Sequence, residues 1–119
     1  MIVRDYRDVE AQVAEGVEGV TVRWVIGEDD GAPHFAMRVF EVQPGCATPY
    51  HQHWWEHEVF VLAGEGVVRG EEGEQPIQEG TVIFIPGDET HQLVNTGQET
   101  LRFICLIPHP WLEGMAAKR

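Results

Sequence analysis

The sequence predicts an all-β domain built as an antiparallel sandwich or a closed barrel. Short runs rich in Val, Ile, Phe and Thr alternate with turns of Gly, Pro, Asp and Glu, and such side chains suit a half-buried sheet. Seven of these runs follow one another at short spacing, which is typical of sandwiches and barrels. A chain of 119 residues is long enough for one core and too short for two.

The predicted strands cover residues 20–26, 34–42, 57–64, 65–70, 80–86, 91–95 and 99–108. Turn residues separate them, for example at Glu28–Gly31 and Pro86–Asp88. The acidic stretch GEEGEQ (70–75) is interpreted as a solvated hairpin loop. Residues 7–15 and 111–118 are the only stretches that could be helical, and both are short.

Twenty acidic and eight basic residues give a formal net charge of −12. This charge argues against a nucleic-acid or anionic-membrane surface, because phosphate binding needs clustered Lys and Arg. The apolar runs are far shorter than the roughly 20 residues of a membrane helix. Cys46 and Cys105 form no CxxC motif, so we expect reduced thiols and a cytoplasmic location. A small molecule remains the expected partner.

Three of the six histidines lie within the stretch HQHWWEH, residues 51–57. On a strand, His51 and His53 project to the same side and can share one ion. On a helix they would diverge by roughly 200°, and the preceding Pro49 favours extended backbone. His57 begins the next predicted strand, on the face opposite Glu58.

A fourth imidazole, His91, opens a later predicted strand. Neighbouring hairpins of an antiparallel barrel can place it across from His51 and His53. Four neutral imidazoles would bind one divalent transition metal, namely Mn, Fe, Ni, Cu or Zn. The alternative is a set of exposed loop histidines, but the period-2 spacing argues against it. His34 and His109 have no such pattern, so we expect them at the surface or in turns.

These residues resemble the two sequence motifs of the cupin superfamily. The first motif, G-x5-H-x-H-x3,4-E-x6-G, is similar to Gly45, His51, His53 and Glu58, with the closing glycine displaced by one position. The second motif, G-x5-P-x-G-x2-H-x3-N, is similar to Gly80, Pro86, His91 and Asn95, with Asp88 where the motif has glycine. The resemblance implies an antiparallel double-stranded β-helix, or jelly-roll barrel, over about residues 34–108 of a single domain 1–119.

The spacing H-x-H-x3-H followed by a late histidine resembles the four-histidine, manganese-type cupins. This resemblance implies that His51, His53, His57 and His91 bind the metal. It favours Mn, with Fe, Ni, Zn or Cu as alternatives. Most metal-binding cupins use three His and one Glu, so Glu58 competes with His57, and strand alternation favours His57. The resemblance also implies a homodimer, with residues 1–26 at its interface.

The interior of a barrel receives alternate residues of each strand. Phe103 and Cys105 share one face of their strand, and the four-histidine relatives place an aromatic residue and a cysteine at the matching positions near the metal. Plain core packing is the alternative for both residues. Arg38 and Phe40 share a face of theirs, although most strand arginines are solvated.

The residues around the histidine stretch give two further candidates for the cavity wall. Trp55 has the parity of His53 and His57, so it would wall the cavity if the strand were unbroken. Glu58 would reach the pocket only if the loop reversed this parity.

The sequence therefore favours a metal-dependent oxidoreductase, dioxygenase-like, that uses O2 or a peroxide on a small apolar or aromatic molecule. A non-catalytic cupin that binds or senses a small ligand is one alternative, and a metal-assisted isomerase is another. We find no nucleophile motif, P-loop or dinucleotide motif that would indicate different chemistry.

Overall fold

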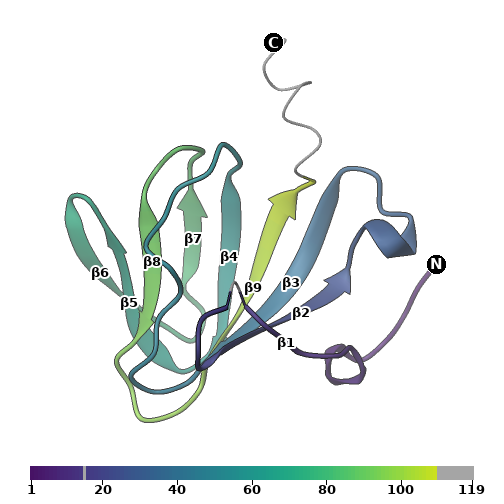
Figure 1. Cartoon of the computed structure of the whole chain (residues 1–119). Helices are drawn as coiled ribbons and strands as arrows, with labels where there is room; N and C mark the ends of the chain where they lie inside the picture. The colour runs from purple at the N-terminus through teal and green to yellow at the C-terminus, as the bar shows by residue number, and fades with distance from the viewer. Residues whose placement is uncertain (15, 110–119) are drawn as a thin grey trace.

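The computed structural model describes residues 1–14 and 16–109, and strands dominate this part of the chain (Figure 1). The strands are β1 (Gln12–Val13), β2 (Val20–Ile26), β3 (Phe35–Val42), β4 (His57–Ala63), β5 (Glu65–Gly70), β6 (Gly73–Gln78), β7 (Val82–Ile85), β8 (His91–Asn95) and β9 (Leu101–Pro108). Two single 3-10 turns, η1 (Tyr6–Asp8) and η2 (Glu28–Asp30), flank β1 and β2. No helix in the described residues is long and apolar enough to cross a membrane.

Two antiparallel sheets form the domain. The larger has the order β1-β2-β3-β9-β4-β7 and the smaller the order β6-β5-β8. β9, the last of the described strands, lies between β3 and β4 in the interior of the larger sheet (Figure 1). The predicted all-β antiparallel class is confirmed.

The segment before β4 runs along the free edge of β8. Backbone hydrogen bonds join Thr48 N to Leu93 O (3.0 Å) and Asn95 N to Cys46 O (3.0 Å). Buried Asn95 also donates its Nδ2–H to the carbonyl of Val42 at 2.8 Å and to that of Glu99 at 2.8 Å. These bonds fix β8 and the histidine-bearing segment side by side.

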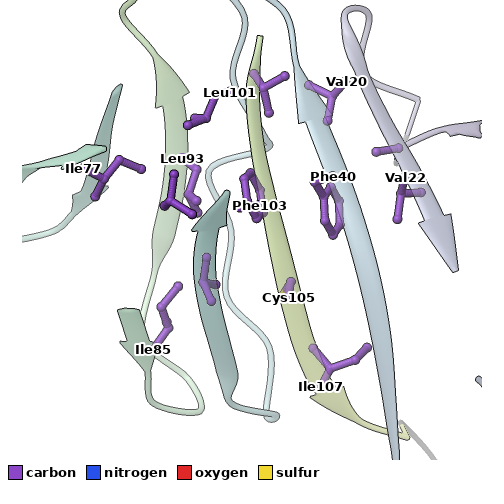
Figure 2. Packing of buried hydrophobic residues seen from close by; sticks show 14 of the residues in the cluster. Val20, Val22, Phe40, Ile77, Ile85, Leu93, Leu101, Phe103, Cys105 and Ile107 are labelled. Carbon is purple, nitrogen blue, oxygen red and sulfur yellow. The ribbon is translucent and has the colours of Figure 1, made fainter. Parts of the chain in front are cut away.

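Alternate residues of the strands fill the space between the sheets. Leu101, Phe103, Cys105 and Ile107 of β9 are buried, whereas the intervening residues are half-buried. Figure 2 shows Phe103 and Phe40 of neighbouring β3 side by side, and their rings stack with centroids 5.2 Å apart. The apolar wall next to the histidines is therefore made of the inward faces of β3, β4 and β9.

Two predictions about local structure are wrong. The possible helix 7–15 is not found in its described residues beyond the 3-10 turn η1, because Gln12 and Val13 pair with β2, and sheet hydrogen bonds outweigh a helix too short to be stable alone. The stretch GEEGEQ is not only a loop, because β6 begins at Gly73 and pairs with β5 along its length. The sequence of β6 contains Gly, Glu and Pro and has one buried residue, Ile77. It therefore lacks the apolar alternation that would predict a strand. The possible helix 111–118 lies outside the described residues.

Candidate metal centre

Four imidazoles from three parts of the chain lie together between the sheets. His51 and His53 precede β4, His57 is the first residue of β4 in the larger sheet, and His91 is the first residue of β8 in the smaller sheet. The His51 and His53 ring centroids are 4.4 Å apart, those of His51 and His91 are 5.1 Å apart, and those of His57 and His91 are 4.8 Å apart.

Backbone hydrogen bonds hold the two histidine-bearing loops in place. His51 and His91 form an antiparallel bridge, with N–H···O distances of 3.2 Å from His51 to His91 and 2.9 Å in return. Asp88 N donates to His53 O at 2.7 Å. Asp88 adopts a φ of 65°, the left-handed conformation that glycine adopts most easily, and glycine is the residue at this position of the motif.

The positions of the ring nitrogens suit a single metal ion. One nitrogen from each of His51, His53 and His91 lies within 4.8 Å of the others. Nε2 of His57 lies 3.0 Å from Nε2 of His53. Two imidazole nitrogens at right angles, each about 2.1 Å from a metal, would be about 3.0 Å apart. The group formed by His51, His53 and His91 therefore fits a divalent transition metal, and His57, which is not part of that group of three, lies beside it.

In His91 and His57, the partner of Nδ1 determines which ring nitrogen carries the proton. His91 Nδ1 lies 2.9 Å from the Glu89 carbonyl oxygen. Because a carbonyl can only accept, His91 carries its proton on Nδ1, and Nε2 keeps the lone pair that a metal needs. His57 Nδ1 contacts the sulfur of Cys105 at 3.1 Å. With its Nδ1 proton donated to Cys105, His57 would keep the lone pair on Nε2 in the same way.

The surroundings also keep two of the imidazoles neutral. Burial lowers the pKa of His57 to about 2, and the nearby His91 and Arg38 add to this effect. Burial likewise lowers the pKa of His53 to about 4, with His51 and His91 contributing. A neutral imidazole is the form that binds metals, so both side chains are ready to do so at neutral pH.

The imidazoles line a small cavity of about 40 Å³. Its described lining consists of Ala14, Val20, Arg38, Phe40, Thr48, Pro49, His51, His53, His57, Val59, Ile85, His91, Leu93, Phe103 and Cys105. None of the described residues that line the cavity is Asp or Glu. The space is sufficient for an ion and one or two water molecules, so a larger ligand has to extend from it.

His57 and Glu58 lie on opposite sides of the larger sheet. His57 is 6% exposed and faces the cavity. Glu58 is exposed on the outer surface, next to Phe60 and Phe84. The expectation that Glu58 could line the pocket is wrong, because the first residues of β4 pair in register with β7 and their side chains alternate between the two faces.

Trp55 is placed differently from the sequence expectation. It is not among the described residues that line the cavity, and its ring instead packs on His53 with centroids 4.1 Å apart. The prediction assumed an unbroken strand, but the chain bends at residues 54–55. The alternation of side chains between the two faces therefore does not continue through the bend. His51 is likewise in a single bridge and His53 is in no strand.

Sequence reasoning underestimated two buried polar side chains. Arg38 is 8% exposed, and its Nη2 donates to Cys105 Sγ at 3.2 Å. His109, expected at the surface or in a turn, is buried, with Nε2 2.6 Å from the Ala32 carbonyl oxygen. The burial of Arg38 could have been inferred because it shares a strand face with Phe40. No alternating pattern in the sequence indicated the burial of His109.

Two of the similar proteins share 35% identity with this chain. The polyketide cyclase RemF from Streptomyces resistomycificus has a structure that matches with a TM-score of 0.85, covering 91% of this chain and 79% of that one. The oxalate-binding protein of Thermotoga maritima matches over 80 residues, 64% of this chain.

A plant protein is also similar. Auxin-binding protein 1 of Arabidopsis thaliana is 36% identical over 76 residues, 56% of this chain. The chain spans 66% of the length of the oxalate-binding protein and 38% of the auxin-binding protein. Each of these two curated relatives is thus matched over only part of its length.

The family model described as the cupin domain matches residues 38–107. The matched segment contains all four clustered histidines and most of the other residues that line the cavity. It also covers more than half of the chain. The chain therefore belongs to the cupin domain family.

Proposed function

We propose that this cupin is a metal-dependent oxidoreductase that uses O2 or a peroxide on a small apolar or aromatic molecule. His51, His53, His57 and His91 would hold one divalent transition metal. The observation that carries the proposal is the convergence of these four rings on a cavity whose described lining has no carboxylate. Such a nitrogen-only donor set suits transition metals rather than Mg or Ca.

The proposed metal is manganese, by resemblance to the four-histidine cupins, with Fe, Ni, Zn or Cu as alternatives. When bound, a redox-active ion would supply the electron-transfer chemistry that O2 or peroxide requires. The neutral histidines leave the net charge of such an ion uncompensated. The site would therefore favour electron-rich or anionic ligands.

The chain itself positions the reaction partners. The Glu89 carbonyl fixes the His91 ring, and the Cys105 sulfur contacts the His57 ring. The stacked Phe40 and Phe103 rings form an apolar wall of the cavity that can exclude water. Apart from the histidines, the described cavity offers no ordinary general base, so electron transfer suits it better than proton abstraction.

Oxygen consumption with catechol, and product formation from styrene with peroxide, test this proposal. Protein loaded with Mn, Fe, Ni, Cu or Zn would be mixed with catechol, and separately with styrene plus peroxide. We expect turnover above that of the free ion with at least one redox-active metal, and its loss in His91→Ala. Rates no higher than those of the free ions, with every metal, would contradict the proposal.

A metal-assisted ring closure is the second candidate, because the chain is 35% identical to a polyketide cyclase over 91% of its length. Ring closure needs no oxidant, so an assay without O2 or peroxide separates the two candidates. Product formed from a polycarbonyl substrate under nitrogen would favour cyclisation. Tight oxalate binding without turnover would instead favour a binding role like the one in the name of the Thermotoga relative.

We also propose that the chain forms a homodimer through its N-terminal region, residues 1–26. β1 is the edge of the larger sheet, and Val13, Trp24 and Ile26 are exposed apolar residues on β1 and β2. Light scattering is expected to give a species of about twice 13.4 kDa. A species of 13.4 kDa at all concentrations would contradict this.

A further inference from the structure

Arg38 is a buried cation without a carboxylate partner among the described residues. The other arginines of the described chain, Arg4, Arg7, Arg23, Arg69 and Arg102, each lie within ion-pair distance of an Asp or Glu. Those five are more exposed than Arg38, which is 8% exposed. Burying an uncompensated charge is costly, so a counter-ion from outside the chain would stabilise this position.

Two aromatic rings and a sulfur hold the Arg38 side chain. Its Cζ lies 4.8 Å from the centroid of the Phe40 ring and 5.3 Å from that of Trp24. Its Nη2 donates to Cys105, while Nε is shielded from solvent and has no hydrogen-bond partner in the described structure. Stacking fixes the plane of the guanidinium but leaves an N–H edge able to bind an oxygen.

Arg38 is one of the residues that line the same cavity as the four imidazoles. One sulfur atom, Cys105 Sγ, contacts both Arg38 Nη2 and His57 Nδ1. Although the chain carries a formal net charge of −12, the described cavity lining contains Arg38 and no acidic side chain. The cavity is thus locally cationic inside an acidic protein, and this selects for an anion.

We propose that Arg38 is the receptor for a carboxylate group of the substrate, and that the substrate class is therefore a small apolar or aromatic carboxylic acid. The planar carboxylate accepts from the Arg38 N–H groups, as guanidinium and carboxylate geometries match. The cavity receives the carboxylate, and the apolar part of the acid extends from it. In placing the acid beside a metal, the inference rests on the proposed function, but the pairing with Arg38 needs no metal.

The test compares acids with their neutral amides of the same shape. Acetate and acetamide, and then benzoate and benzamide, would be titrated into metal-loaded and metal-free protein by calorimetry. We expect the wild type to bind at least one acid about tenfold or more tightly than its amide, with or without metal. Equal affinities for acid and amide in both pairs, or no binding of either acid, would overturn the inference.

Matched variants identify the residue responsible. Arg38→Met keeps an unbranched side chain between the rings and is expected to abolish the preference for the acid, while Arg38→Lys keeps part of it. Arg69→Gln, which removes an exposed arginine of β5, should change nothing. An unaltered preference in folded Arg38→Met protein would exclude Arg38 as the receptor.

Metal content separates the two proposals. Elemental analysis of Arg38→Met is expected to give the wild-type metal content. Wild-type protein that binds no metal would contradict the proposed function but leave the acid preference testable in the same titrations. Loss of metal together with loss of the preference in Arg38→Met would show that Arg38 acts on the metal site instead, and would also overturn this inference.

Discussion

Nδ1 of His57 lies 3.1 Å from the sulfur of Cys105, while Nε2 of the same ring lies 3.0 Å from Nε2 of His53. Nδ1 of the ring thus contacts a residue of the cavity wall, and Nε2 faces the other histidines. Ligating histidines commonly donate their second N–H to a carboxylate or a carbonyl. Here a buried cysteine would take that role, and burial raises the pKa of its thiol.

Replacing Cys105 should therefore weaken metal binding without removing a ligand. We expect Cys105→Ala to reduce the affinity about 10- to 100-fold, the usual effect of losing such a partner, and Cys105→Ser to recover part of it. Competition with a chromophoric chelator measures this. Cys46→Ala, the matched control at the other free cysteine, should keep the wild-type affinity. Wild-type affinity in Cys105→Ala would show that the sulfur only packs.

The stability of the metal-free protein should fall between pH 7 and pH 5. The pKa of His57, about 2, is below the unfolded value of about 6.5, so the unfolded chain binds the extra proton as the pH drops. Each such proton lowers the free energy of unfolding by about 1.4 kcal/mol per pH unit below 6.5. His53, with a pKa of about 4, adds less because it is more exposed.

Urea denaturation at several pH values tests this dependence. His57→Asn should flatten it, and His34→Asn, at an exposed histidine, should leave it unchanged. The expected dependence is absent if the free energy of unfolding is constant from pH 7 to pH 5.

The turn at Gly87 should tolerate no side chain. A Cβ at this position would overlap the carbonyl oxygen of Trp54, and the next residue, Asp88, holds His53 through its N–H. We expect Gly87→Ala to lower the free energy of unfolding by about 2 kcal/mol or more and to weaken metal binding. Asp88→Gly, which suits the left-handed backbone there, should remain folded and bind metal. A wild-type melting temperature for Gly87→Ala would contradict the tight contact.

Much of this fold can be predicted from sequence because its strands carry strong local signals. The run ETLRFICLIP alternates apolar residues toward one core, and the structure buries them alternately. β6 lacks such a signal, because its place is set by pairing with β5 rather than by its own composition. β1 has only two residues and exists through its contact with β2.

In the candidate site, too, some residue positions can be predicted from the sequence and others cannot. His57 and Glu58 are on a regular strand, so alternation correctly predicts which faces inward. Trp55 lies in a bend, where no period applies, and its environment depends on contacts made by the fold. The burial of Arg38 without an acidic partner cannot be read from its own strand, because it depends on what β2 and β9 place around it.

We propose that His57, and not its neighbour Glu58, completes the metal site. The direct measurement is the metal-to-protein ratio, by elemental analysis after dialysis against a weak chelator, for the wild type, His57→Ala and Glu58→Ala. We predict about one ion per chain for the wild type and Glu58→Ala, and most of it lost in His57→Ala. Full metal occupancy in folded His57→Ala, or loss of metal in Glu58→Ala, would contradict the assignment of His57 as a ligand.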